Sequence, residues 1–174
     1  MSFRQGGGYN VKPEKKVIVV GAAIGGLAAA IALRQSALQP VLFERAPELR
    51  EVGAGLSLWP NALKALGDLG LAESIRALSI REAAGGLRSW DGRMLMKMES
   101  AELERRLGDV TVMIHRAELL RALSTEVPPG TVHLGAKCVG LAQDRNRVTA
   151  QFEDGSEVNG DALVGADGLH STHP

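Results

Sequence analysis

The chain of 174 residues lacks the features that would support several broad classes of function. Its single cysteine, Cys138, excludes an internal disulfide and a cysteine-rich zinc site. Aromatic residues make up 3% of the sequence, too few for a platform on which bases or sugars stack. The 20 basic and 20 acidic residues cancel, so we expect neither nucleic acid nor an anionic membrane as a partner. The four histidines show no ligand spacing, so we expect no metal site.

Long apolar runs are also scarce, and only residues 17–33 could be considered as a membrane span or a signal peptide. This uncharged run stands at the lower limit of about 17 residues for a spanning helix, and three glycines would interrupt it. Removal of a signal peptide would also discard the partner that the next predicted strand needs. We therefore interpret the run as part of a soluble fold, and we expect a cytoplasmic protein without a membrane span.

The same run is the most informative part of the sequence. A β-branched segment, 17–20, stops at Gly21, crosses a turn of small residues and continues into a helical pattern. The start of such a helix points free N–H groups at an anion. A second apolar run ends in Glu44, roughly 20 residues further on, where dinucleotide-binding βαβ units hold a ribose hydroxyl. The G-x-G-x-x-G pattern is imperfect, because Ala23 stands at its second glycine.

Weaker patterns predict the other elements. Helices are expected at 60–66, 71–78 and 116–123. An Asp91-Gly92 pair predicts a hairpin within 82–98. Further strands are expected at 132–134, 137–143, 147–152, 156–159 and 162–165. Residues 1–14 are expected to form a disordered tail.

These elements together predict an α/β fold. We expect a parallel βαβ core over 15–44, extended by 132–134 and 162–165. The three strands between 137 and 159 should form an antiparallel meander against this core, and 82–98 should contribute part of a second sheet. Asp167-Gly168 follows the last core strand, at the sheet edge where ligands of doubly wound sheets gather.

Five segments in one order carry a family resemblance over about residues 15–172: 19–26, 43–46, 52–61, 115–120 and 163–171. The chain resembles the N-terminal half of group A FAD-dependent monooxygenases, flavoprotein aromatic hydroxylases of the salicylate and 6-hydroxynicotinate type. The resemblance implies a Rossmann-like FAD-binding core over 15–172, with a partial substrate-domain insertion at about 75–112. It also implies FAD as cofactor, NADH or NADPH as reductant, and a small aromatic substrate.

The resemblance assigns cofactor contacts to residues along the whole chain. The turn formed by Gly21, Ala22, Ala23, Ile24, Gly25 and Gly26 would line the FAD pyrophosphate. Glu44 would accept hydrogen bonds from the adenosine ribose, with Arg45 beside the adenine. Val52 and Gly53 would pass near the flavin, and Arg116 would reach the cofactor from the start of a helix. Asp167 and Gly168 match a motif associated with both FAD and NAD(P)H. No residue is predicted to be a catalytic acid or base, because the flavin carries most of the chemistry.

The sequence departs from the family pattern at three places. The methyl group of Ala23 would crowd the pyrophosphate at a cost of about 1–3 kcal/mol. Ala37 stands where a helix-ending glycine is expected, so its left-handed cap would carry a Cβ penalty. The family pattern continues beyond Ser171, so we expect 173–174 to be an aberrant end and the C-terminal half to be missing.

On this basis the chain alone is expected to be inactive as a monooxygenase. Three alternatives stay open. The chain could be a non-catalytic nucleotide-binding fragment that pairs with a separately encoded C-terminal half, a disrupted gene product, or the NAD-binding domain of another oxidoreductase.

Overall fold

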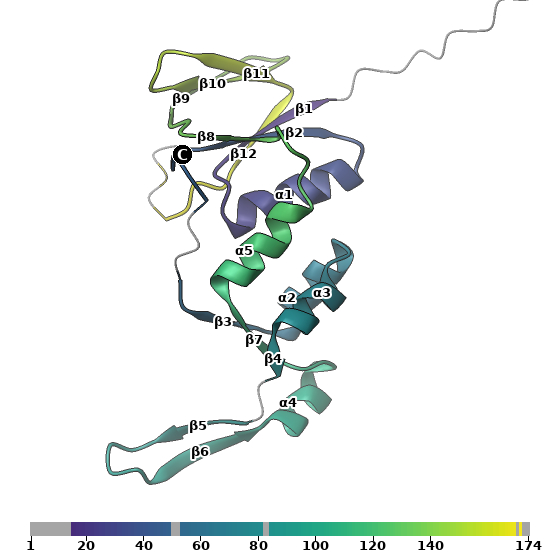
Figure 1. Cartoon of the computed structure of the whole chain (residues 1–174), viewed down its shortest axis with the longest axis vertical. Helices are drawn as coiled ribbons and strands as arrows, with labels where there is room; N and C mark the ends of the chain where they lie inside the picture. Colours follow the sequence, from purple (N-terminus) through teal and green to yellow (C-terminus); the bar gives the residue numbers. More distant parts are fainter. Residues whose placement is uncertain (1–14, 50–52, 82–83, 170, 172–174) are drawn as a thin grey trace, which may run out of the picture.

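The computed structural model describes residues 15–49, 53–81, 84–169 and 171. A four-stranded parallel sheet lies in the upper part of the molecule in Figure 1, between an antiparallel sheet and the helices. Its order is β12-β1-β2-β8. The strands are β1 (Lys16–Val20), β2 (Gln39–Glu44), β8 (Val132–Leu134) and β12 (Ala162–Gly165). All three pairings are parallel, which confirms the predicted core and both of its extensions. The expectations for 1–14 and 173–174 lie outside the described residues.

Helices cover one face of this sheet. Helix α1 (Ile24–Gln35) connects β1 to β2 and buries Leu27 and Ala30 completely against the sheet. Helix α5 (Arg116–Thr125) lies beside α1 and shares its apolar cluster. The Arg34 guanidinium donates to the Glu126 carbonyl oxygen (2.8 Å), so the two helices are also joined at one end. Helices α2 (Pro60–Asp68) and α3 (Ala72–Leu78) form where the sequence predicts them.

The opposite face of the sheet is covered by the predicted meander. It comprises β9 (Cys138–Gln143), β10 (Val148–Phe152) and β11 (Glu157–Gly160), paired antiparallel in the order β11-β10-β9. A second apolar cluster joins Ile18 of β1 to Ala150 and Phe152 of β10. Because β1 is covered on both faces, its sequence is an unbroken apolar run rather than an alternating one.

A second region lies beyond the helices, at the far end of the molecule from the parallel sheet (Figure 1). Strand β7 (Val112–His115) pairs antiparallel with β3 (Gly55–Leu58) and β4 (Ile80–Arg81). Strands β5 (Ala84–Arg88) and β6 (Met94–Glu99) form the predicted hairpin, which leads into α4 (Ser100–Leu107). The sequence patterns did not predict α4, β3, β4 or β7, because all four are short and α4 is mostly polar.

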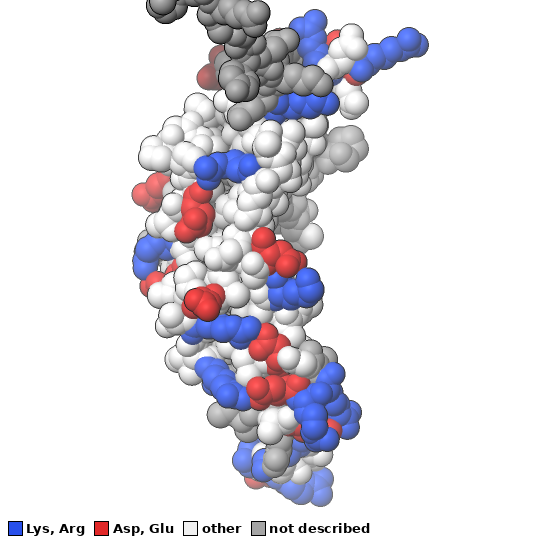
Figure 2. All heavy atoms as spheres, turned by 90° about the vertical axis from the view of Figure 1, so that its right-hand side faces the viewer, with Lys and Arg blue, Asp and Glu red and all other residues white. Residues whose placement is uncertain are grey.

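Charged side chains of both signs are interspersed on the face shown in Figure 2. Several charged residues form ion pairs, such as Arg76 with Asp109, whose closest atoms are 2.6 Å apart. The hydrogen bond from Arg76 holds the pKa of the Asp109 carboxyl below its usual value. The part of that face formed by described residues therefore presents no extended patch of a single sign.

Helix α1 ends in a left-handed turn at Ala37, the only non-glycine residue with positive φ in the described ranges (φ 55°). The Ala37 N–H donates to Arg34 O and the Leu38 N–H donates to Leu33 O, both at 3.0 Å. This pair of bonds is a Schellman motif, in which glycine is the usual residue at the left-handed position. The structure therefore confirms that an alanine, with its β-carbon, adopts the left-handed conformation at this cap.

We expect Ala37→Gly to raise the free energy of unfolding by about 1 kcal/mol, because it relieves the left-handed conformation of an L-residue. Urea denaturation monitored by circular dichroism measures the change. Ser36→Gly is the matched control, since Ser36 precedes the turn at φ −90° and should gain nothing from glycine. A glycine variant at position 37 no more stable than the parent would contradict the expectation.

Candidate functional site

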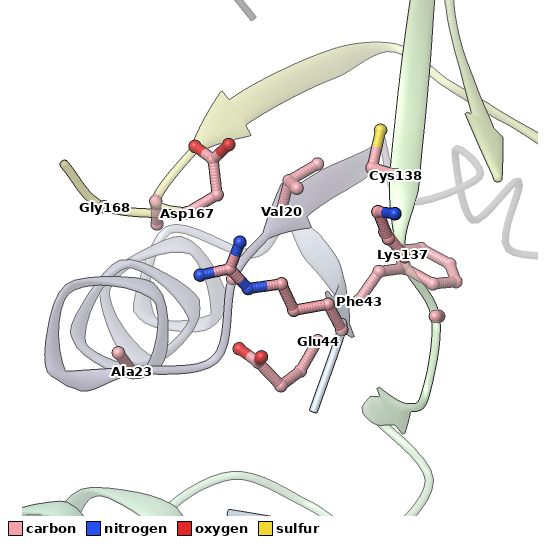
Figure 3. A pocket seen from close by; sticks show the side chains of 12 residues that line it. Val20, Ala23, Phe43, Glu44, Lys137, Cys138, Asp167 and Gly168 are labelled. Atoms are coloured by element: carbon pink, nitrogen blue, oxygen red, sulfur yellow. The ribbon is translucent and has the colours of Figure 1, made fainter. Parts of the chain in front are cut away.

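A groove runs across the carboxyl ends of β1, β2 and β12. It consists of two adjoining hollows that share one floor. The shared lining residues are Val20, Ala23, Ala166, Asp167 and Gly168. The first hollow, shown in Figure 3, continues past Phe43 and Glu44 at the end of β2. The second continues past Ile24 and Gly25 at the start of α1 to Arg116 at the start of α5.

The turn between β1 and α1 is closed tightly by two glycines. Gly21 has φ +102°, and a β-carbon there would lie 2.3 Å from the carbonyl oxygen of Ala166. A β-carbon on Gly26 would lie 1.9 Å from the carbonyl oxygen of Gly21. Neither position can carry a side chain without moving backbone, so the turn brings the start of α1 close to the ends of β1 and β12.

The start of α1 presents backbone amides to the groove. The first hydrogen bond at the N-terminal end of this helix runs from the Leu27 N–H to Ala23 O (3.0 Å). The amides of Ile24, Gly25 and Gly26 precede it and lie at the positive end of the helix dipole. The Gly21 N–H already donates to Phe43 O (2.8 Å), so this amide does not serve a ligand. Gly21 instead allows the turn to pack closely against the backbone of Ala166. The arrangement suits an anionic group.

Ala23 occupies the N-cap position of α1 and lines both hollows. Its backbone is extended (φ −78°, ψ −172°), a conformation that any residue adopts without strain. The departure from the glycine pattern therefore costs the turn nothing in backbone conformation. Its effect is confined to the methyl group, which occupies space at the groove.

The Glu44 carboxylate links the end of β2 to the turn through hydrogen bonds. One oxygen of its carboxylate accepts a hydrogen bond from the Ala22 N–H, and the other accepts one from the Ala46 N–H, both at 2.9 Å. Each oxygen keeps a further lone pair with which it can accept a hydroxyl hydrogen of a ligand. The carboxylate lies between the turn that carries Ala23 and the strand that carries Phe43 (Figure 3).

Arg116 reaches the groove from a different part of the chain. It begins α5, immediately after His115, whose Nδ1 caps the helix by accepting from the Ala117 N–H (3.3 Å). Its own N–H donates to the Ala54 carbonyl oxygen (3.2 Å), and its aliphatic stem lies against Gly53. Val52, which the sequence also assigned to the site, lies outside the described residues.

The structure gathers most of the predicted site residues along this one groove. Those that line it are Gly21, Ala23, Ile24, Gly25, Glu44, Arg45, Arg116, Asp167 and Gly168. Ala22 and Gly26 are buried beneath the turn, and Gly53 lies behind Arg116, so these three shape the groove rather than line it.

Sequence reasoning missed the contribution of the meander. Lys137 and Cys138, at the start of β9, line the first hollow beside Phe43 (Figure 3). The Lys137 ammonium pairs with Glu153 (2.6 Å), and burial raises the pKa of the Cys138 thiol. No local pattern marks these residues, because their place depends on how the meander crosses the sheet.

Within the described ranges, no helix is long and apolar enough to cross a bilayer. In the same ranges, no cluster of three or more histidine, cysteine or acidic residues is arranged to hold a metal ion.

Comparison with known proteins identifies close relatives. The sequence pattern of a family described as "FAD binding domain" matches residues 14–173. The chain is 38% identical over 158 residues to 3-amino-4-hydroxybenzoate 2-monooxygenase of Streptomyces cremeus, covering 90% of this chain and 40% of that protein. It is 36% identical over 159 residues to FAD-dependent urate hydroxylase of Klebsiella pneumoniae, covering 90% and 41%.

The fold agrees with these relatives. The crystal structure of Klebsiella pneumoniae HpxO complexed with FAD and uric acid superimposes with a TM-score of 0.83 at 34% identity. The match covers 90% of this chain and 40% of that one. The chain thus spans about two fifths of the length of the relatives it matches.

Proposed function

The chain belongs to the FAD binding domain family, and from this premise we propose that it binds FAD in the groove at the carboxyl ends of β1, β2 and β12. We further propose that it is the FAD-binding part of an NAD(P)H-dependent monooxygenase that hydroxylates a small aromatic compound. The relatives named for urate and for an aminohydroxybenzoate support an electron-rich ring as substrate class. A cytoplasmic location is part of this proposal.

The observation that carries the proposal is the convergence of three elements on one groove. The amides at the start of α1 face it, the Glu44 carboxylate stands at the end of β2, and Arg116 approaches from α5. These groups fit a dinucleotide, whose pyrophosphate would lie at the helix start and whose ribose would donate to Glu44. Gly21 and Gly26 support the same proposal, because they let the turn pack tightly against the Ala166 backbone and against itself, which sets the start of α1 at the groove.

When bound, FAD supplies the redox chemistry, accepting electrons from NADH or NADPH and passing them to oxygen. The residues of this chain bind and orient the cofactor. Glu44 fixes the ribose, the α1 amides fix the pyrophosphate, and Arg116 holds positive charge at the second hollow. The residues that select the aromatic substrate would belong to the part of the relatives that this chain does not span, carried by the same polypeptide or by a complementary one.

The rival function is NAD binding by a domain of another oxidoreductase. Glu44 does not distinguish the two functions, because its carboxylate can bind any ribose with a free 2′-hydroxyl. Titration calorimetry with FAD and with NAD separates the two. We expect tighter binding of FAD, since Arg116 and Asp167 extend the groove beyond the reach of the α1 turn. Tighter binding of NAD would reverse the assignment.

We expect Ala23→Gly to tighten FAD binding about tenfold, equivalent to about 1.4 kcal/mol. The substitution removes a methyl group from the groove, and glycine is also a better N-cap residue than alanine. Quenching of flavin fluorescence on titration measures the affinity. Unchanged or weaker binding by the glycine variant would show that the turn already accommodates alanine.

A further inference from the structure

Gly53 and Arg116 are brought together by the second sheet, although they are far apart in the sequence. Strands β3 and β7 pair antiparallel with Gly55 opposite His115. The pairing continues one step further, because the Arg116 N–H donates to the Ala54 carbonyl oxygen (3.2 Å). Gly53 therefore lies next to the first residue of α5.

The stem of Arg116 occupies the space that a side chain at position 53 would need. A β-carbon built on Gly53 would lie 2.8 Å from Cδ of Arg116, 2.9 Å from its Cβ and 3.3 Å from its Cγ. Glycine is therefore required at position 53 by the arginine that lies over it.

Gly55, two residues further on, is a glycine without such a neighbour and serves as a comparison. A β-carbon on Gly55 would meet no atom within 4 Å, and the φ of Gly55 is outside the left-handed region. The two glycines thus belong to the same segment and differ in their contact with Arg116.

From Gly53 the arginine leads into the groove. Arg116 lines the second hollow together with Ile24, Gly25 and Asp167, opposite the start of α1. A side chain at position 53 would displace the Cγ and Cδ atoms of Arg116, and the guanidinium beyond them would move with the stem.

We propose that Gly53 is a positioning residue for Arg116. Because Gly53 has no side chain, it leaves room for the arginine stem and thereby places the guanidinium at the cofactor groove. Gly53 acts through the arginine rather than by contact with the flavin. The proposal rests on the proposed function, since the arginine is taken to act on bound FAD.

A double-mutant cycle tests this on the purified chain, with FAD affinity measured by flavin fluorescence. We expect Gly53→Ala to weaken FAD binding about tenfold or more, the scale of a charge-assisted hydrogen bond lost. In an Arg116→Ala background the same change should weaken binding less than about twofold, because the guanidinium is already gone. Gly55→Ala is the matched control and should change the affinity less than about twofold.

Equal losses from Gly53→Ala in both backgrounds would overturn the proposal, and so would no loss in either. If Gly53→Ala melts too early for a binding measurement, Arg116→Ala should raise its melting temperature in part, because it removes the Cγ and Cδ atoms that clash, and Arg116→Gly should raise it further, because it also removes the Cβ atom. Failure of that rescue would also overturn the proposal.

A measurement without FAD separates this proposal from the proposed function. In the NMR spectrum of the ligand-free chain, we expect nuclear Overhauser contacts between the Gly53 α-protons and the Arg116 δ-protons. Their absence would refute the seat for the arginine, whatever the chain binds. If these contacts are present and the unmodified chain binds no FAD, the proposed function fails while the placement of the arginine stands.

Discussion

Gly26→Ala is expected to lower the free energy of unfolding by about 3 kcal/mol or more, at the upper end of overpacking costs. The new β-carbon would lie 1.9 Å from the oxygen and 2.9 Å from the carbon of the Gly21 carbonyl. Both are backbone atoms of a turn held by the bond from the Gly21 N–H to Phe43 O (2.8 Å). The clash can therefore be relieved only by opening the turn between β1 and α1. Urea denaturation measures the loss.

Gly25→Ala provides the control for this prediction, because a β-carbon on Gly25 meets no atom within 4 Å. Alanine is the better helix former, so this variant should be as stable as the parent or more stable by up to about 1 kcal/mol. A Gly26→Ala chain that unfolds at the same urea concentration as the parent would show that the turn is not closed as described.

Glu44→Ala is expected to weaken FAD binding about 100-fold and to destabilise the ligand-free chain as well. The first effect follows from the loss of a charged acceptor for the ribose, worth about 1.5–3 kcal/mol per hydrogen bond. The second follows because the Ala22 N–H loses its partner, and Ala22 is only 1% exposed. Titration calorimetry and thermal unfolding measure the two effects separately.

Glu44→Gln refines this test, because its amide oxygen can accept from only one of the two N–H groups that the carboxylate now satisfies. We expect it to lie between the parent and Glu44→Ala in both measurements. Glu126→Gln is the charge-matched control, since Glu126 joins α1 and α5 through its backbone carbonyl alone. If Glu44→Gln matched the parent in affinity and in melting temperature, the role assigned to this carboxylate would be wrong.

The sequence predicted those parts of the fold in which the helices and strands are close together along the chain. The βαβ core lies within one short stretch of sequence, so the apolar strands, the glycine turn and the helical pattern could be recognised as one unit. The structure confirms this unit. The meander and the β5–β6 hairpin were predicted for the same reason, since their strands are joined by short turns. The left-handed conformation of Ala37 was predicted from the family resemblance, which places a helix-ending glycine at this position.

The sequence by itself therefore determined the dinucleotide-type turn, with its amides at the start of α1 and its acidic residue at the end of β2. Only the tertiary structure decided what surrounds that turn: Arg116 seated on Gly53, Lys137 and Cys138 along the first hollow, and the Glu44 carboxylate bonded to the Ala22 N–H. The reason is physical. Hydrophobic periodicity and turn chemistry act over a few residues, whereas these contacts depend on the strand order β12-β1-β2-β8 and on the pairing of β3 with β7, which no local pattern specifies.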